Sequence, residues 1–162
     1  MKRQMTVTDV TRMQQGRVCV AGYIGGRCVR PLLGETGANP TEEWLWGAEE
    51  AIIRPFAVTE LDFIDKGMPV TPPHTEDCLV TAGYSANLGQ LSESQRKDFL
   101  RSIDDGSVED IFEAPVISEH GHYVEIGKGK RSLGTIGGAG IYKVVFDNEF
   151  DGWRYRRMFG WS

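Results

Sequence analysis

The sequence has few of the residues that cross-link a fold or bind a metal. Its 162 residues include three cysteines and three histidines. The cysteine count is odd and no C-x-x-C pair occurs, which excludes a disulfide framework and a zinc ribbon. We therefore expect reduced thiols, no metal site and no cofactor.

Long apolar runs are also absent. No stretch approaches the roughly 20 consecutive apolar residues of a membrane-spanning helix. The basic first residues are not followed by the apolar region of a secretory signal. With 40% hydrophobic and 25% charged residues, the composition is that of a globular protein rather than a disordered one. We expect a cytoplasmic protein with no membrane partner, folded as one domain or as two small halves.

The net charge of -5 argues against indiscriminate binding of polyanions, but the charge is unevenly distributed. Residues 1–38 carry +4, residues 39–126 carry -13, and residues 127–162 carry +4. Because the ends of a compact domain often meet, the two basic segments could form one positive surface for an anion or a nucleic acid. Alternatively, the basic ends neutralise the acidic middle within the fold.

Short runs rich in Val, Ile, Thr and aromatic residues, bounded by Gly, Pro or Asn, predict a mainly β fold with minor helices. The expected strands are Met5–Val10, Arg17–Ile24, Arg27–Leu33, Phe56–Ile64, Cys78–Ala82, Ala114–Ser118, His122–Ile126, Ser132–Ile136, Ile141–Phe146 and Trp153–Phe159. Many short strands are typical of barrels and sandwiches. Gly25-Gly26 predicts a two-residue hairpin turn, since glycine adopts positive φ freely.

Helical signals lie between the strand groups. Thr41 can cap a helix that starts with acidic residues, and Ser92 with Gln95 has the spacing of a capping box. Ser107 with Asp110 indicates a third, brief helix. The most polar connector, residues 84–105, predicts a boundary between two β modules, at residues 1–83 and 106–162.

Several motifs resemble the bacterial dual OB-fold domain family. The run Gly16–Gly22, the run Gly26–Leu32, the turn Pro73–Val80 and the segment Arg131–Gly134 are similar to sequences of that family. Cys28 departs from the pattern, because the family usually has a tryptophan there, so a stacking role for that ring is absent. The resemblance implies two small OB-like β-barrels in tandem, a binding function and an association with bacterial defence loci.

Two groups of cations are candidates for anion binding. Arg17 and Arg30 flank the glycine turn, and Pro31 favours an extended Arg30 that suits either a bidentate anion contact or an internal ion pair. Lys128, Lys130 and Arg131 lie in a glycine-rich connector whose backbone can approach a phosphate. The connector lacks the spacing of a Walker loop, and a flexible hairpin is the alternative interpretation.

The terminal strand interleaves rings and guanidinium groups. Alternation places Trp153, Tyr155, Arg157 and Phe159 on one face and Arg154, Arg156 and Met158 on the other. Single-strand binders combine stacking rings with cations in this way, so Arg154, Tyr155 and Arg156 are candidate contacts. The competing interpretation is that the rings form barrel core and the arginines face solvent.

The favoured hypothesis is a non-enzymatic module that binds single-stranded nucleic acid or a nucleotide-like anion, as accessory subunit of a defence system. The second hypothesis is an adaptor that docks a partner protein, encoded nearby, through Trp44, Trp46 and the acidic segment Glu42–Glu50. A hydrolase centred on His74, Glu76 and Asp77 ranks last, because no nucleophile is recognisable beside them. We therefore assign no catalytic residue and no metal ligand.

Overall fold

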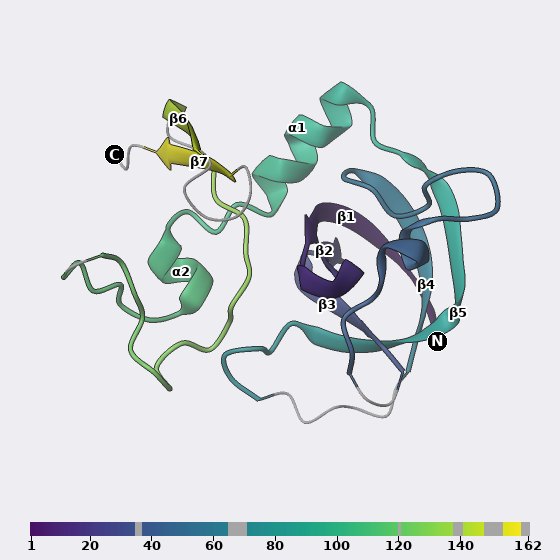
Figure 1. Cartoon of the computed structure of the whole chain (residues 1–162), viewed down its shortest axis with the longest axis horizontal. Helices are drawn as coiled ribbons and strands as arrows, with labels where there is room; N and C mark the ends of the chain where they lie inside the picture. Colours follow the sequence, from purple (N-terminus) through teal and green to yellow (C-terminus); the bar gives the residue numbers. More distant parts are fainter. Residues whose placement is uncertain (35–36, 65–70, 120, 138–140, 148–153, 160–162) are drawn as a thin grey trace.

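A closed β-barrel is built by the first part of the chain (Figure 1). The computed structural model describes residues 1–34, 37–64, 71–119, 121–137, 141–147 and 154–159, with the backbone alone for Tyr84 and the last two ranges. The barrel strands are β1 (Lys2–Arg12), β2 (Val18–Ile24), β3 (Arg27–Leu33), β4 (Ala57–Phe63) and β5 (Asp77–Gln90). The 3-10 helices η1 (Gln14–Gly16) and η2 (Glu42–Leu45) lie in the β1–β2 and β3–β4 connections.

The strand order around the barrel is β1-β2-β3-β5-β4, with β4 closing back onto β1. All neighbours are antiparallel except β3 and β5, which pair in parallel from Arg30↔Asp77 to Leu33↔Val80. The rest of β5 pairs with β4 as far as Ala57↔Gln90. One long strand thus pairs with two neighbours and closes the barrel.

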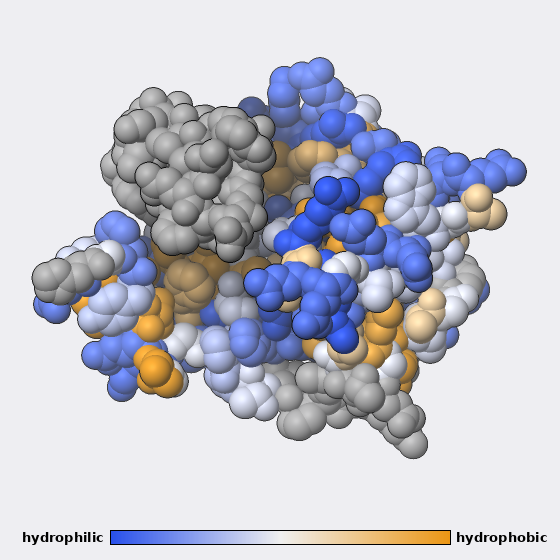
Figure 2. Space-filling model, viewed as in Figure 1, coloured by the Kyte–Doolittle hydropathy of each residue, from blue (hydrophilic) through white to orange (hydrophobic). Residues whose placement is uncertain are grey.

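Alternation along the strands fills the barrel with small and branched side chains. The core cluster contains Met5, Val7, Val18, Val20, Val29, Leu61, Phe63 and Val80, with Trp44 and Ile53 packed among them. Gly22 also belongs to the inner row of β2, and a Cβ there would lie 2.5 Å from the Thr6 oxygen. Hydrophilic residues cover most of the visible barrel face (Figure 2).

The local signals for the turn and for two helices are confirmed. Gly25 and Gly26 have φ values of 57° and 83°, as a primed turn between β2 and β3 requires. Helix α1 (Glu93–Ser102) begins at Ser92 with a complete capping box to Gln95. Helix α2 (Val108–Phe112) begins at Ser107, whose hydroxyl accepts the Asp110 N–H. Thr41 precedes only the four-residue η2 and makes no side-chain cap bond.

The predicted strands at Ala114–Ser118, His122–Ile126 and Ser132–Ile136 were wrong. The structure has only isolated bridges there, Ile117↔Tyr123 and Asp104↔Thr135. In the third segment, backbone N–H groups donate to the carboxylates of Glu76 and Asp105 instead of to a neighbouring strand. In the second, Tyr123 and Ile126 are exposed, so this run has no sheet face to bury.

The last strands, β6 (Ile141–Asp147) and β7 (Arg154–Phe159), form a separate two-stranded antiparallel sheet. The described residues therefore show one closed barrel, and the second barrel over residues 106–162 stays a prediction. The boundary predicted after residue 83 falls inside β5. Within the described ranges, no helix has the length and apolar character needed to cross a membrane.

Candidate ligand-binding groove

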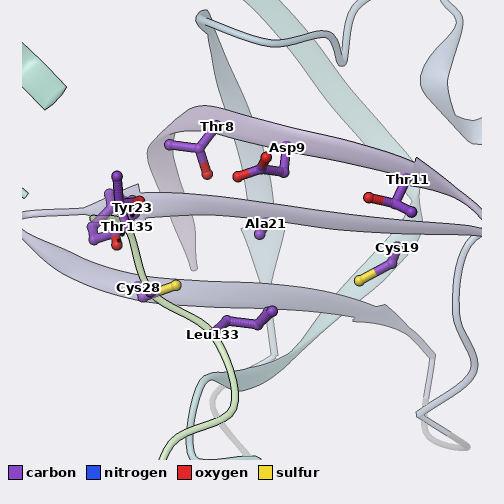
Figure 3. A pocket seen from close by; sticks show the side chains of 10 residues that line it. Thr8, Asp9, Thr11, Cys19, Ala21, Tyr23, Cys28, Leu133 and Thr135 are labelled. Atoms are coloured by element: carbon purple, nitrogen blue, oxygen red, sulfur yellow. Dashed lines mark hydrogen bonds between the residues drawn. The ribbon is translucent and has the colours of Figure 1, made fainter. Parts of the chain in front are cut away.

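A groove of about 240 Å³ runs along the outer surface of β1 and β2 (Figure 3). Because Val18, Val20 and Gly22 point into the barrel, the alternate residues Cys19, Ala21 and Tyr23 form an outward row. Ala21 pairs with Asp9 of β1 and Cys19 pairs with Thr11. The small side chains of β2 thus form the floor, and Thr8, Asp9 and Thr11 form one wall.

The other wall comes from the distant segment Leu133–Thr135, which crosses the strands at the Tyr23 end (Figure 3). The Tyr23 hydroxyl donates to the Thr135 hydroxyl at 3.1 Å. Tyr23 and Cys28 of β3 also pack with Ile103, Phe99 and Leu133. The groove is therefore closed at Tyr23, while Cys19 and Thr11 lie at its opposite end.

Burial keeps the two titratable groups at the closed end neutral over a wider pH range. Desolvation raises the pKa of Tyr23 to about 12, although the hydrogen bond with Thr135 works in the opposite direction. Desolvation also raises the pKa of the Cys28 thiol to about 11. Both groups are therefore neutral near pH 7, and this end offers hydrogen-bonding groups without charge.

Two carboxylates hold the crossing segment in place. Asp105 accepts from the Arg131 guanidinium at 2.6 Å and from the Thr135 N–H at 3.0 Å. The same guanidinium donates to the carbonyl oxygens of Ile111 and Asp110, which ties it to α2. Burial lowers the pKa of Arg131, but the hydrogen bond and charge of Asp105, together with Glu113, outweigh this effect and raise it. Arg131 is thus a structural cation.

Glu76 provides the second attachment. This carboxylate is 2% exposed and accepts both the hydroxyl and the backbone N–H of Ser132. The Nδ1 atom of His74 lies 2.9 Å from the same hydroxyl. A serine therefore does lie beside His74 and Glu76, which the sequence did not indicate. However, the histidine does not bridge serine and carboxylate, and Ser132 is held through its backbone too, so these contacts fasten the segment to the turn before β5.

The open end of the groove leads toward Arg17. Its extended backbone continues β2, so its side chain belongs to the same outward row as Cys19. The guanidinium is exposed and makes one long hydrogen bond, 3.3 Å, to the Asn39 carbonyl oxygen. A ligand in the groove would meet hydroxyls and one carboxylate, and Arg17 lies two residues beyond Cys19 without lining the groove itself.

The other candidate cations of the barrel and the connector differ in their availability. Arg30 donates to Asp77 at 2.5 Å, and their side chains are 18% and 11% exposed, so the internal ion pair is the alternative observed. Lys130 pairs with Glu113 at 3.2 Å, whereas Lys128 is exposed. Among the sequence-derived cations with described side chains, Arg17 and Lys128 are the two without an ion pair.

The aromatic candidate residues also differ in their exposure. Trp44 is 8% exposed in the core, and its buried indole N–H has no acceptor among the described residues. Its place in the core excludes the predicted role as an exposed docking residue. Trp46 is 61% exposed. For Arg154, Tyr155 and Arg156 the structure describes the backbone and not the side chains. In the pairing of β7 with β6, these residues lie opposite Asp147, Phe146 and Val145.

None of the residues that line the groove was a candidate site residue by sequence. The outward row from Arg17 to Tyr23 follows from its period of two, and Thr8 and Asp9 belonged to the expected strand Met5–Val10, whereas Thr11 lies just beyond it. The wall at Leu133–Thr135 had no such signal, because it depends on carboxylates 30 and 56 residues away.

Within the described ranges, no three His, Cys, Asp or Glu side chains are grouped as a metal site would require. No family model, no curated protein and no solved structure matches the chain.

Proposed function

We propose that the protein is a non-enzymatic binding module that holds one nucleotide of a single strand, or a nucleotide-like anion, in the groove on β1 and β2. The observation that carries the proposal is the position of the groove on a barrel with strand order β1-β2-β3-β5-β4. This order supports an OB-like barrel, and OB barrels bind oligonucleotides on the face of their second and third strands. The groove shares β2 with that face and includes Cys28 of β3. A role as accessory subunit of a defence system follows from the family resemblance.

The size and chemistry of the groove favour a small polar ligand. Its volume of about 240 Å³ is below the ~300–1,000 Å³ of pockets for drug-sized molecules. Thr8 and Thr11 can donate and accept hydrogen bonds, and Asp9 accepts them, as base edges and ribose hydroxyls require. Because Tyr23 is packed edge-on against Phe99, recognition relies on hydrogen bonds more than on stacking.

We expect Arg17, beyond the open end of the groove, to contact the phosphate. With Arg30, Lys130 and Arg131 engaged by carboxylates, Arg17 and Lys128 remain as the unpaired candidates with described side chains. A single strand that neutralises one or two phosphates gives a slope of log affinity against log salt of about -0.7 to -1.4. Binding is therefore expected to depend only weakly on salt.

The test is fluorescence anisotropy with a fluorescein-labelled eight-nucleotide strand, for the wild type and matched variants. Arg17→Ala should weaken binding and flatten the salt slope by about 0.7. Asp9→Asn and Thr11→Ala should weaken binding at every salt concentration. The control is Arg101→Ala, which removes an equal charge from the exposed side of α1 and should change little.

A second measurement locates the ligand independently of affinity. Cys19 lines the groove and is half-buried, so saturating oligonucleotide should slow its alkylation, as followed by mass spectrometry. Unprotected Cys19 together with tight binding would place the ligand elsewhere on the molecule. Absence of binding at low salt, where electrostatic attraction is strongest, would refute the nucleic-acid hypothesis.

A further inference from the structure

Trp46 is presented to solvent by a short, ordered loop between η2 and β4. The Trp46 N–H donates to the Glu43 carbonyl at 3.1 Å, and the Gly47 N–H donates to the Glu50 carbonyl at 2.8 Å. Trp46 also forms a bridge with Ala51. These backbone bonds fix the loop, so the exposed ring loses little conformational freedom when a partner binds.

Two hollows meet beside this ring. One, of about 450 Å³, is lined by Trp44, Trp46, Glu43 and Ala82 among others. The second, of about 570 Å³, is lined by Glu49 and Glu50 among others, and both include Gly47 and Ile52. A Cβ at Gly47 would lie 2.6 Å from the end of the Ile52 side chain, so a larger residue at this junction would require Ile52 to shift. Together they form a shallow trough along the loop.

The charged residues that line the trough are all acidic. Glu43 and Glu49 are exposed, and neither has an ion pair within the described part of the chain. Glu50 differs, because it lies 3.7 Å from Arg54 and accepts a hydrogen bond from the Asn87 amide at 2.8 Å. Glu43 thus lines the same hollow as the Trp46 ring, and Glu49 lines the adjoining one. Negative charge near an exposed indole ring attracts a cation to the ring face. The same carboxylates repel phosphates, which sets this surface apart from the groove on β1 and β2.

We propose that this trough docks a cationic segment of another protein, with a Lys or Arg side chain on Trp46 between Glu43 and Glu49. A large exposed aromatic on a rigid loop is the residue type that contributes most at interfaces, and surrounding charges select the partner and its orientation. Apolar neighbours of the cation would lie on Ile52, which lines both hollows. The residues that line this trough differ from those that line the groove on β1 and β2, so the proposal does not depend on the oligonucleotide site.

The test uses a fluorescein-labelled peptide of alternating arginine and leucine, with a glutamate and leucine peptide as the negative probe. The wild type should bind only the cationic peptide. Trp46→Ala should weaken binding about tenfold, and Glu43→Gln with Glu49→Gln about three- to tenfold. The matched control, Glu119→Gln with Glu125→Gln, removes the same charge from exposed positions away from the trough and should change affinity less than twofold.

An equal effect of the control pair would show non-specific attraction and overturn the proposal, as would unchanged binding by the Trp46 variant. Thermal melting of each variant checks folding, and Trp46→Phe retains a ring if the alanine variant is unstable. Sedimentation velocity tests whether a second copy of the chain occupies the trough instead. A dimer that Trp46→Ala abolishes would show this and overturn the proposal. Oligonucleotide binding should be unchanged in all these variants, so the two proposals can fail separately.

Discussion

The parallel pairing of β3 with β5 depends on the Arg30–Asp77 ion pair, and its removal should be costly. The atoms are 2.5 Å apart, and the side chains are 18% and 11% exposed. The Asp77 hydrogen bond raises the pKa of Arg30. The arginine remains charged when this partner is lost, because a guanidinium keeps its proton at any physiological pH. Breaking a buried pair by removing one member costs about 3–5 kcal/mol, and the partial exposure here favours the lower end. We expect about 3 kcal/mol for Asp77→Ala.

The measurement is urea unfolding followed by circular dichroism. With a slope of about 2 kcal/mol per molar urea, the midpoint of Asp77→Ala should fall by about 1.5 M. Asp98→Ala, which breaks the exposed pair with Arg101 on α1, should cost under about 0.5 kcal/mol. The double variant Arg30→Met with Asp77→Leu should recover most of the loss, because no unpaired charge remains. If Asp77→Ala costs no more than the exposed control, the pair is solvated and the reasoning fails.

Three further predictions concern the barrel wall, a thiol and a carboxyl group. Gly22→Ala should cost about 1–3 kcal/mol, because its Cβ would lie 2.5 Å from a backbone oxygen of β1; a wild-type urea midpoint would contradict this. Cys28 has a pKa of about 11, so only about one thiol in a thousand is a thiolate at pH 8. Cys19 should therefore be alkylated before Cys28. Equal alkylation rates of the two cysteines, followed by mass spectrometry, would refute this. Backbone N–H groups, the largest contribution coming from Gly137, lower the pKa of Asp104. The stabilisation from this contact is therefore fully present above the ordinary carboxyl pKa and is lost as the pH falls through the lower pKa of Asp104 in the folded protein. The NMR signal of the Gly137 amide should shift in that pH range. An unchanged signal in acid would contradict the hydrogen bond.

The parts of the fold set by local chemistry were predictable. The glycine turn, the bounds of β3 and the capping box of α1 each depend on residues close in sequence. The extension of β5 to Gln90 was not predictable, because its last residues are polar and owe their extended form to pairing with β4. In the groove, the outward row of β2 could be predicted from the sequence, but the position of the segment Leu133–Thr135 could not.

The cations show the same division. A count of charges correctly describes basic ends and an acidic middle, but it does not say which carboxylate each arginine meets. Arg131 is a candidate for phosphate binding by sequence and is bound to Asp105 in the structure. Trp44 and Trp46 are two residues apart, yet one is buried and the other is exposed. Such outcomes depend on tertiary contacts that a single sequence does not display.

The dual pairing of β5 has a consequence for the order of folding. Before residues 77–90 leave the ribosome, the strands already made can form only the open sheet β4-β1-β2-β3. The outer edges of β3 and β4 then carry unpaired backbone groups, which are templates for pairing with other chains. Closing these edges requires contacts such as Arg30 with Asp77, 47 residues apart, so the step is slow relative to hairpin formation. Synthesis of the last barrel strand therefore ends the interval in which the nascent chain is most prone to aggregate.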